Sequence, residues 1–240
     1  FPVTAYQMTN VCAKLEANIN TKASWYTKSN KRAAAYVTYN DLVGASATMP
    51  YLDDVEPGSY FGLMRARTAS QGLPAGYRVT LPTEAQWELA CRAGTSTPYG
   101  RGAGETASFS NGVADAVCRY KYDGGWGYNA DGAFKWFANA ASFARCGSYA
   151  PNAYGLYDML GNVAEVCLDW YAPVDSAAHT GVDPVGPRLE NAGARKRVAR
   201  GGSAWHDATG TVCSRRDQAG HDEISSLYGF RLAIILEPMR

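Results

Sequence analysis

The segment 197–233 holds the side chains best able to do chemistry, and it reads RVARGGSAWHDATGTVCSRRDQAGHDEISSLYGFRLA. Ser203, His206 and Asp207 have the residue types of a hydrolase triad, but all three lie within five positions. A triad needs side chains that converge from separate elements, with the base oriented by a third group. We therefore interpret these residues, and His221 after them, as loop residues and not as a catalytic set.

Six cysteines are the other reactive groups, and none of them stands in a CxxC pair. This spacing argues against a zinc site and against a thioredoxin-like motif. Several of the cysteines lie in apolar sequence, where a free Cys behaves as a small hydrophobic residue. We expect mostly buried thiols at Cys12, Cys91, Cys118, Cys146, Cys167 and Cys213.

The charged residues are balanced, with 23 Lys and Arg against 22 Asp and Glu and a net charge of +1. A chain with this charge balance and without a run of basic residues has no positive electrostatic field that would attract nucleic acid or an anionic membrane surface. We expect the arginines of the C-terminal part to pair with carboxylates as structural contacts, namely Arg200, Arg215, Arg216 and Arg231.

Two amphipathic helices precede the segment. Thr4 and Gln7 form a T-x-x-Q capping box, and apolar residues at helical spacing follow as far as Ile19. Thr83 and Gln86 repeat this arrangement in LPTEAQWELACRAG. The sequence predicts a helix after each threonine.

The remaining elements are short. Residues 33–42 (AAAYVTYNDL) favour a strand, and residues 53–62 (DDVEPGSYFG) favour a loop. Residues 94–151 have no helical period, which is typical of organised loops that carry function or ions. In RVARGG and YGFRLAIIL the residue types alternate as they do in β-strands. We predict an α+β fold with two helices, short antiparallel strands and many loops.

The length and the apolar content bound the number of domains. With 240 residues and 46% hydrophobic residues, the chain can bury one large core, so we expect a single domain over residues 1–240. The longest apolar run is LAIIL at residues 232–236, too short to cross a membrane. Residues 1–20 lack a signal-peptide pattern, but Phe1 is not a natural start, so a leader could have been removed.

Four motifs in this order resemble the formylglycine-generating enzyme (sulfatase-modifying factor) family: YRVTLPTEAQWELACRAG, PNAYGLYDMLGNVAEVCLDW, RVARGGS and YGFRLA. They lie between residues 77 and 233. The resemblance implies a variant of the C-type lectin fold. The predicted fold class is therefore α+β, C-type-lectin-like, of the formylglycine-generating-enzyme type.

The resemblance to the enzymes implies oxidation of a substrate cysteine by two thiols, three and eight residues after the GGS serine. Here those positions are His206 and Thr211, and Cys213 lies two residues out of register. One thiol cannot supply the paired sulfur chemistry that copper capture and substrate exchange require. The related sulfoxide synthases bind iron through a His-rich partner domain, and this chain has only three histidines. We therefore expect no enzymatic activity.

A calcium site is also implied by the resemblance. Hard cations take oxygen ligands from carboxylates and from the carbonyls of a tight turn. The positions that match the family's site are Asp158 and Glu165 with the carbonyls of Gly161 and Val163. The alternative is a Gly-Asn turn whose carboxylates are solvated or paired with arginine. We expect no other cofactor.

One branch of the fold resembles the segment closely: the variable proteins of diversity-generating retroelements. In them, adenine-directed mutagenesis rewrites a segment framed by RGGS…W and GFRLA, and asparagine codons never become Trp, Gln, Glu, Lys or Met. Of the 23 residues from His206 to Tyr228, only Gln218 and Glu223 fall outside the reachable set. We predict that residues 204–228 form a variable ligand-binding surface, whose contact positions are Ala204, His206, Asp207, Thr209, Thr211, Asp217, His221, Asp222, Ser226 and Tyr228.

The predicted function is thus a non-enzymatic protein that displays a diversified surface on a C-type lectin scaffold. Two alternatives stay open: an enzyme or enzyme accessory protein of the same family, with Cys213 or His206 as its reactive group, and a plain structural interaction domain. We expect a protein or cell-surface ligand, no nucleic acid and no transmembrane segment, and the sequence leaves the oligomeric state open. The expected location is the cell surface or the extracellular space, with anchoring through a region that precedes Phe1.

Overall fold

The computed structural model of the protein describes residues 1–15, 32–45, 55–102, 105, 111–120, 126–128, 134–136, 143–174, 181–187 and 196–236. Over these residues the chain forms helices and short strands, and the strands lie in three sheets. This mixture confirms the α+β class predicted from the sequence.

Three helices begin with the same cap: α1 (Ala5–Val11), α3 (Tyr39–Val43) and α5 (Glu84–Arg92). In each of them a threonine hydroxyl accepts a hydrogen bond from the backbone N–H three residues later. The side chain of that later residue accepts a bond from the threonine N–H in return. The predictions of α1 and α5 are confirmed, although α1 ends at Val11 and Ile19 lies outside the described residues.

Two segments differ from the prediction. Residues 33–42 are not a strand, because Thr38 and Asp41 form a capping box that starts α3. Helix α4 (Tyr60–Ser70) begins at Ser59 inside the stretch predicted as a loop. Gly62 allows this start, because a Cβ at that position would lie 2.1 Å from the Glu56 carbonyl oxygen.

The long stretch 94–151 was also predicted without helices. It contains α6 (Asn111–Val117), which the sequence analysis missed. It also contains a short antiparallel pair, β2 (Trp126–Tyr128) with β3 (Phe134–Trp136). The expected absence of a helix in this stretch is therefore wrong.

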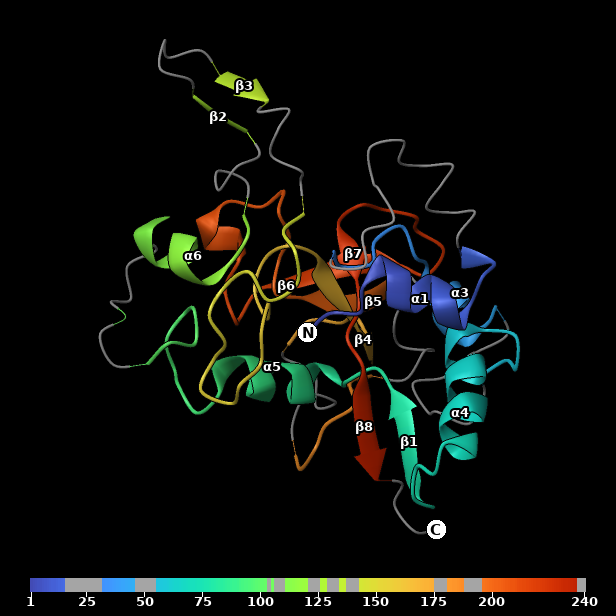
Figure 1. Ribbon diagram of the computed structural model, residues 1–240. Helices are drawn as coiled ribbons and strands as arrows, with labels where there is room; N and C mark the ends of the chain where they lie inside the picture. The colour runs from blue at the N-terminus through green and yellow to red at the C-terminus, as the bar shows by residue number, and fades with distance from the viewer. Residues whose placement is uncertain are drawn as a thin grey trace.

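The main sheet has four strands in the order β6-β5-β4-β7, and Figure 1 shows it near the centre of the molecule. Its strands are β4 (Ala164–Trp170), β5 (Lys196–Arg200), β6 (Arg216–Gly220) and β7 (Tyr228–Gly229). β4 and β6 both pair with β5 in antiparallel fashion, and β7 pairs with β4 in parallel. β6 is thus an edge strand, and the whole predicted binding segment lies between β5 and β7.

The third sheet pairs β1 (Tyr77–Thr80) with β8 (Ala233–Leu236), which brings the chain after the binding segment back beside the start of α5. The predicted strands in RVARGG and YGFRLAIIL are therefore confirmed as β5, β7 and β8. α4 contacts α1, α3 and β1, whereas α5 packs on β4 and β5. In Figure 1, α1, α3 and α4 lie on one side of the main sheet and α6 lies on the other.

Buried apolar side chains form two clusters. One joins α1, α3 and α4 to the main sheet and includes Phe61, Phe143 and Phe230. The other surrounds α5 and α6 and includes Trp87 and Val198. All six cysteines are free thiols, and all except Cys146 are buried, as predicted. No helix in the described part of the chain is both long and apolar enough to cross a membrane.

Candidate ligand-binding surface

Buried residues hold both ends of the segment. At its start, Arg200 and Ser203 are fully buried at the end of β5, and at its end Phe230 is fully buried beside β7. The guanidinium of Arg231 pairs with Glu165 on β4, with Nη2 2.7 Å from Oε1 and Nε bonded to Oε2. Phe230 therefore lies in the core, and Arg231 has the structural pairing that the sequence predicted.

Residues 204–213 form the first turn of the segment. The Asp207 carboxylate caps a short 3-10 helix (Ala208–Gly210) by accepting a bond from the Gly210 N–H at 3.0 Å. It also accepts the Thr209 hydroxyl bond at 2.7 Å, and these hydrogen bonds, led by that of Thr209, lower the pKa of Asp207. Asp207 and Thr209 are both exposed. The turn is thus ordered by local bonds while it presents these two side chains to solvent.

Ser203 and His206 do meet, at 3.1 Å between Oγ and Nδ1. The Ser203 N–H also donates to Nδ1 at 3.0 Å, and Ser203 has no exposed surface. Asp207 points into its own turn and does not orient His206. A nucleophile with no exposed surface cannot meet a substrate, so the geometry supports a structural role. Burial lowers the pKa of His206, and the carboxylate of Asp217 acts in the opposite direction.

Asp217 lies on the edge strand β6 beside the first turn. Its carboxylate pairs with Arg215, with Nη2 2.6 Å from Oδ1, and its Oδ2 lies 3.9 Å from His206 Nε2. The hydrogen bond to Asp217 raises the pKa of Arg215. These three side chains are partly exposed, so they form one charged group at the rim of the surface.

Residues 221–227 form the second turn, and residues 36–40 support it. The Tyr36 N–H donates to the Ser225 carbonyl at 3.0 Å, and the Asn40 amide donates to Asp222. The His221 ring stacks on Trp170 with centroids 5.4 Å apart. The sequence analysis missed this support, because Asn40 and Asp222 are 182 positions apart and no local signal connects them.

Seven of the ten predicted contact positions are exposed or partly exposed, and three are not. Ala204, Thr211 and Tyr228 are buried, with exposed fractions of 7%, 0% and 8%. The Thr211 hydroxyl donates to the Ala208 carbonyl, and the Tyr228 hydroxyl donates to the Gln218 carbonyl at 2.8 Å. These three side chains hold the segment together, so their prediction as ligand contacts is corrected. The others are His206, Asp207, Thr209, Asp217, His221, Asp222 and Ser226.

The predicted structural pairing of the four arginines is confirmed. Arg216 forms a two-bond pair with Glu84 at the first residue of α5, at 2.5 and 2.7 Å. Arg200 reaches Glu88 one turn further along the same helix. Arg215 and Arg231 pair with Asp217 and Glu165 as described above. The two flanks of the segment are therefore tied to α5 and to β4 by charge-assisted bonds.

The side chains of the predicted calcium site do not fit a cation as they are placed. Both carboxylate oxygens of Glu165 accept bonds from Arg231. Gly161 has a positive φ of 67° and allows close backbone packing, because a Cβ there would lie 2.1 Å from the carbonyl oxygen of Arg119. The described residues hold no group of three or more His, Cys, Asp or Glu side chains able to bind a metal ion. Calcium at Asp158, Gly161, Val163 and Glu165 stays a prediction of the resemblance.

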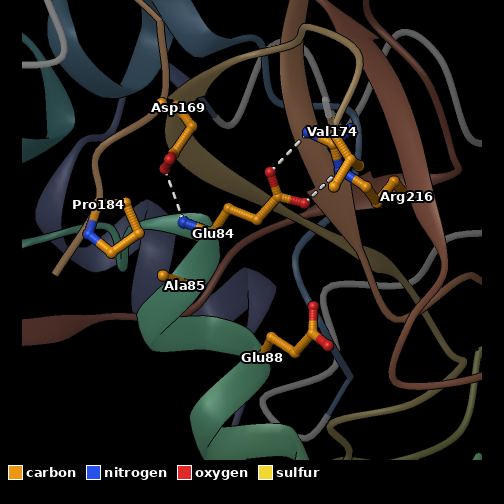
Figure 2. A pocket seen from close by; sticks show the side chains of 8 residues that line it. Glu84, Ala85, Glu88, Asp169, Val174, Pro184 and Arg216 are labelled. Atoms are coloured by element: carbon orange, nitrogen blue, oxygen red, sulfur yellow. Dashed lines mark hydrogen bonds and ion pairs between the residues drawn. The ribbon is translucent and has the colours of Figure 1, made fainter. Parts of the chain in front are cut away.

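A cavity of about 180 Å³ lies at the N-terminal end of α5, and Figure 2 shows its lining. Asp169 on β4 accepts a bond from the Glu84 N–H at 2.6 Å, and Glu84 turns its carboxylate to Arg216. Burial raises the pKa of Asp169 to about 7. The charged side chains that line this cavity form hydrogen bonds and ion pairs within the protein. We therefore interpret them as structural contacts beneath the segment.

A thiol pair was not predicted. Cys91 at the end of α5 and Cys213 at the end of the first turn bring their sulfur atoms within 3.0 Å. The sequence offers no signal for this pair, because the two residues are 122 positions apart. Two sulfur atoms therefore lie together at the base of the surface, where the sequence indicated one.

A family model described as the sulfatase-modifying factor enzyme 1-like domain matches residues 9–236. The chain belongs to this family. Formylglycine-generating enzyme of Streptomyces coelicolor is 36% identical over 222 residues, which cover 80% of this chain and 63% of that protein. Serine/threonine-protein kinase pkn1 of Chlamydia pneumoniae is 32% identical over 154 residues, covering 64% of this chain and 20% of that protein.

This member of the sulfatase-modifying factor family spans less than two thirds of the length of those relatives. Among solved structures, Treponema denticola variable protein 1 matches with a TM-score of 0.66 and 21% identity, over 98% of this chain and 82% of that one. PvdO from Pseudomonas aeruginosa matches with a TM-score of 0.61 and 20% identity, over 96% and 77%. At identities this low, structural matches show the fold alone. These matches confirm the predicted C-type-lectin-like fold of the formylglycine-generating-enzyme type.

Proposed function

We propose that this protein is a non-enzymatic ligand-binding member of the family that displays residues 204–228 to a protein or cell-surface ligand. One observation carries the proposal: both ends of the segment are buried, while its two turns are exposed. Arg200 and Phe230 have no exposed surface, whereas Asp207, Thr209 and Asp222 are exposed. A scaffold of this kind keeps its fold while the side chains on its turns change.

The residue types on the two turns suit contact with a macromolecule. Short polar residues such as Thr209 and Ser226 offer adaptable hydrogen bonds, as they do in antibody loops. Aspartate adds charge that complements a partner and favours its approach. Substitution of exposed residues of this kind usually changes stability by no more than about 0.5 kcal/mol. The segment therefore meets the physical requirement for a surface that exists in many versions.

The family's enzymatic chemistry finds little support at the matching positions. Thr211 stands where the resemblance implies the second catalytic thiol, and it is fully buried. His206 stands where the resemblance implies the first thiol, and its Nδ1 is bonded to Ser203. Thr211 is therefore part of the scaffold, and His206 is held by the turn that presents it at the partly exposed surface.

The decisive test is genetic. We expect the gene, sequenced across many cells, to vary between codons 204 and 228 at positions templated by adenine. A near-copy of the segment and a reverse transcriptase gene should lie close by. An invariant gene without such a copy would contradict the diversified surface. The same proposal places the protein at the cell surface or outside the cell, which labelling of intact cells with an impermeant reagent would detect.

A second candidate function is favoured by one observation, the thiol pair. Two sulfur atoms 3.0 Å apart could supply the paired thiols of a formylglycine-generating enzyme, the name carried by the Streptomyces coelicolor relative. Cys91 and Cys213 are, however, only 2% and 0% exposed, which leaves no approach for a substrate peptide. Incubation with a cysteine-containing sulfatase peptide, with and without copper, should yield no aldehyde by mass spectrometry. An aldehyde above the level of a Cys213→Ala control would establish the enzyme instead.

A further inference from the structure

Cys91 and Cys213 join two elements that the chain does not connect locally. Cys91 lies near the end of α5, and Cys213 closes the first turn of the binding surface just before β6. Their sulfur atoms are 3.0 Å apart and both residues are buried. A small further approach would bring this one pair to bonding distance.

The backbone on both sides of the pair is held in place. The Cys213 N–H donates to the Pro98 carbonyl at 2.8 Å, and the Cys213 carbonyl accepts a bond from Arg200 Nη2 at 3.0 Å. The Asn152 amide donates to the Cys91 carbonyl at 3.2 Å. The two thiols are therefore aligned by contacts that do not depend on the sulfur atoms.

Gly100 makes room for this arrangement. It has a positive φ of 69°, and a Cβ there would lie 2.7 Å from the Cys91 carbonyl oxygen and 3.3 Å from the Cys213 sulfur atom. Only a glycine lets the chain cross so close to both cysteines. The loop that follows α5 thus packs over the pair and leaves the two sulfur atoms facing each other.

We propose that Cys91 and Cys213 are a disulfide site, which fixes the first turn of the binding surface to α5. The oxidant is a small-molecule disulfide, such as oxidised glutathione. One thiolate attacks a sulfur of the oxidant and releases one small thiol, which leaves a mixed disulfide. The second cysteine then attacks the protein sulfur of that intermediate and releases the second small thiol. Two electrons and two protons leave the pair and end in the two released thiols.

Burial decides when this exchange takes place. Desolvation raises the pKa of Cys91 well above its ordinary value. The thiolate is the reactive form, so the closed pair reacts slowly. The bond therefore forms while the first turn is still open, during folding or local unfolding. Once the turn closes, the same burial protects the bond from reductants.

The test is a measurement of cross-links in the natural chain. The protein is refolded with mixed oxidised and reduced glutathione, denatured, alkylated, digested and mapped by mass spectrometry. Before alkylation we expect an intact mass about 2 Da below that of the fully reduced chain, and after digestion one dominant cross-linked peptide pair, which contains Cys91 and Cys213. Six alkylated cysteines, or a dominant link between other cysteines, would overturn the proposal.

Two variants separate this bond from a general effect of cysteine replacement. Cys213→Ser should abolish the cross-link, whereas the matched control Cys146→Ser, at the one partly exposed cysteine, should retain it. Reduction should lower the melting temperature of the natural protein and of the control by roughly 5 to 15 °C. If Cys213→Ser fails to fold, the cross-link map of the natural chain still decides the matter.

The consequence for binding rests on the proposed function, but the bond itself does not. A disulfide fixes the first turn before a ligand arrives and so reduces the ordering cost of binding. If the cross-link is found and no diversified ligand-binding surface exists, the proposed function fails and the disulfide stands. If the surface exists and the cysteines stay reduced under equilibrated oxidant, the disulfide fails alone.

Discussion

Arg231 and Glu165 form the most buried ion pair of the segment, and they show how single residues define its limits. The Trp87 indole also donates to Glu165, at 2.6 Å, so each oxygen of this carboxylate has a partner. Loss of one member of such a pair leaves an unpaired buried charge, which costs more than the intact pair contributes. The arginine of GFRLA is therefore fixed by the carboxylate of the preceding motif, GNVAEV.

Asp169 allows a prediction at the residue scale. Burial raises its pKa to about 7, whereas an aspartate in an unfolded chain has a pKa near 3.9. Between these values the folded protein holds a proton that the unfolded chain has released. The contribution of Asp169 to the free energy of unfolding is thus complete below about pH 4 and falls as the pH rises to about 7.

Asp169→Asn removes this titration and keeps an oxygen that can accept the Glu84 N–H. We expect the difference in unfolding free energy between the variant and the natural protein to grow with pH, by up to about 1.4 kcal/mol per pH unit. Urea unfolding at intervals from pH 5 to pH 8 measures it. The same change at exposed Asp222 is the control. Parallel curves for Asp169→Asn and the natural protein would contradict the raised pKa.

At the scale of elements, the sequence predicts what depends on local signals. The capping boxes at Thr4 and Thr83 identified α1 and α5, because both partners of each box lie within four residues. The motif order identified β5 and β7 as the borders of the surface. Helix α4 was not predicted because Pro57, Gly58 and Gly62 are typical of a loop, whereas Gly62 is required near the start of the helix by the close backbone of Glu56 and Pro57.

The sequence predicted the proposed binding surface as one continuous segment. It could not predict which side chains of that segment are exposed and which are buried. Burial of Thr211 and Tyr228 depends on hydrogen bonds to Ala208 and Gln218, which the folded turns create. The support of the second turn by Asn40 depends on contacts between distant parts of the chain. Such contacts follow from packing, and no residue type or spacing in the sequence indicates them.

The segment 204–228 contains exposed side chains, whereas buried side chains such as Phe230 hold its ends. This difference leads to a prediction about stability. Combined replacement of exposed Thr209, Gln218 and Asp222 by alanine should lower the free energy of unfolding by no more than about 1.5 kcal/mol, or about 0.5 per site. Phe230→Ala alone should lower it by about 3 to 5 kcal/mol. The reason is that Phe230 contacts Tyr60 with ring centroids 5.1 Å apart inside the core.

Urea unfolding of both variants against the natural protein measures this contrast. The supporting result is a small change for the triple variant together with a large change for Phe230→Ala. A triple variant as unstable as Phe230→Ala would mean that the exposed turns also hold the fold. The surface would then be unable to vary.

At the scale of the whole molecule, the segment belongs to both apolar clusters. Ala208, Val212 and Cys213 pack in the cluster around α5 and α6, whereas Ala219 and Tyr228 pack in the cluster of α1, α3 and α4. The proposed binding surface is therefore the outer side of a segment that joins the two halves of the core. Variation across its whole length would disturb both clusters, so we expect diversity to be concentrated at the exposed positions.

The pairing of Glu165 with Arg231 leads to a prediction about calcium binding. The resemblance implies calcium at Asp158 and Glu165, but a guanidinium already supplies the positive charge at Glu165. A cation that binds only the folded state raises the melting temperature by mass action, and its removal lowers it. Since Arg231 is part of the chain, a chelator cannot remove this charge.

We therefore expect the same melting temperature in millimolar EDTA and in millimolar calcium, measured by calorimetry. A melting temperature that falls on chelation in the natural protein, and does not respond in Asp158→Ala, would restore the calcium site and require Arg231 to leave Glu165 when the ion binds.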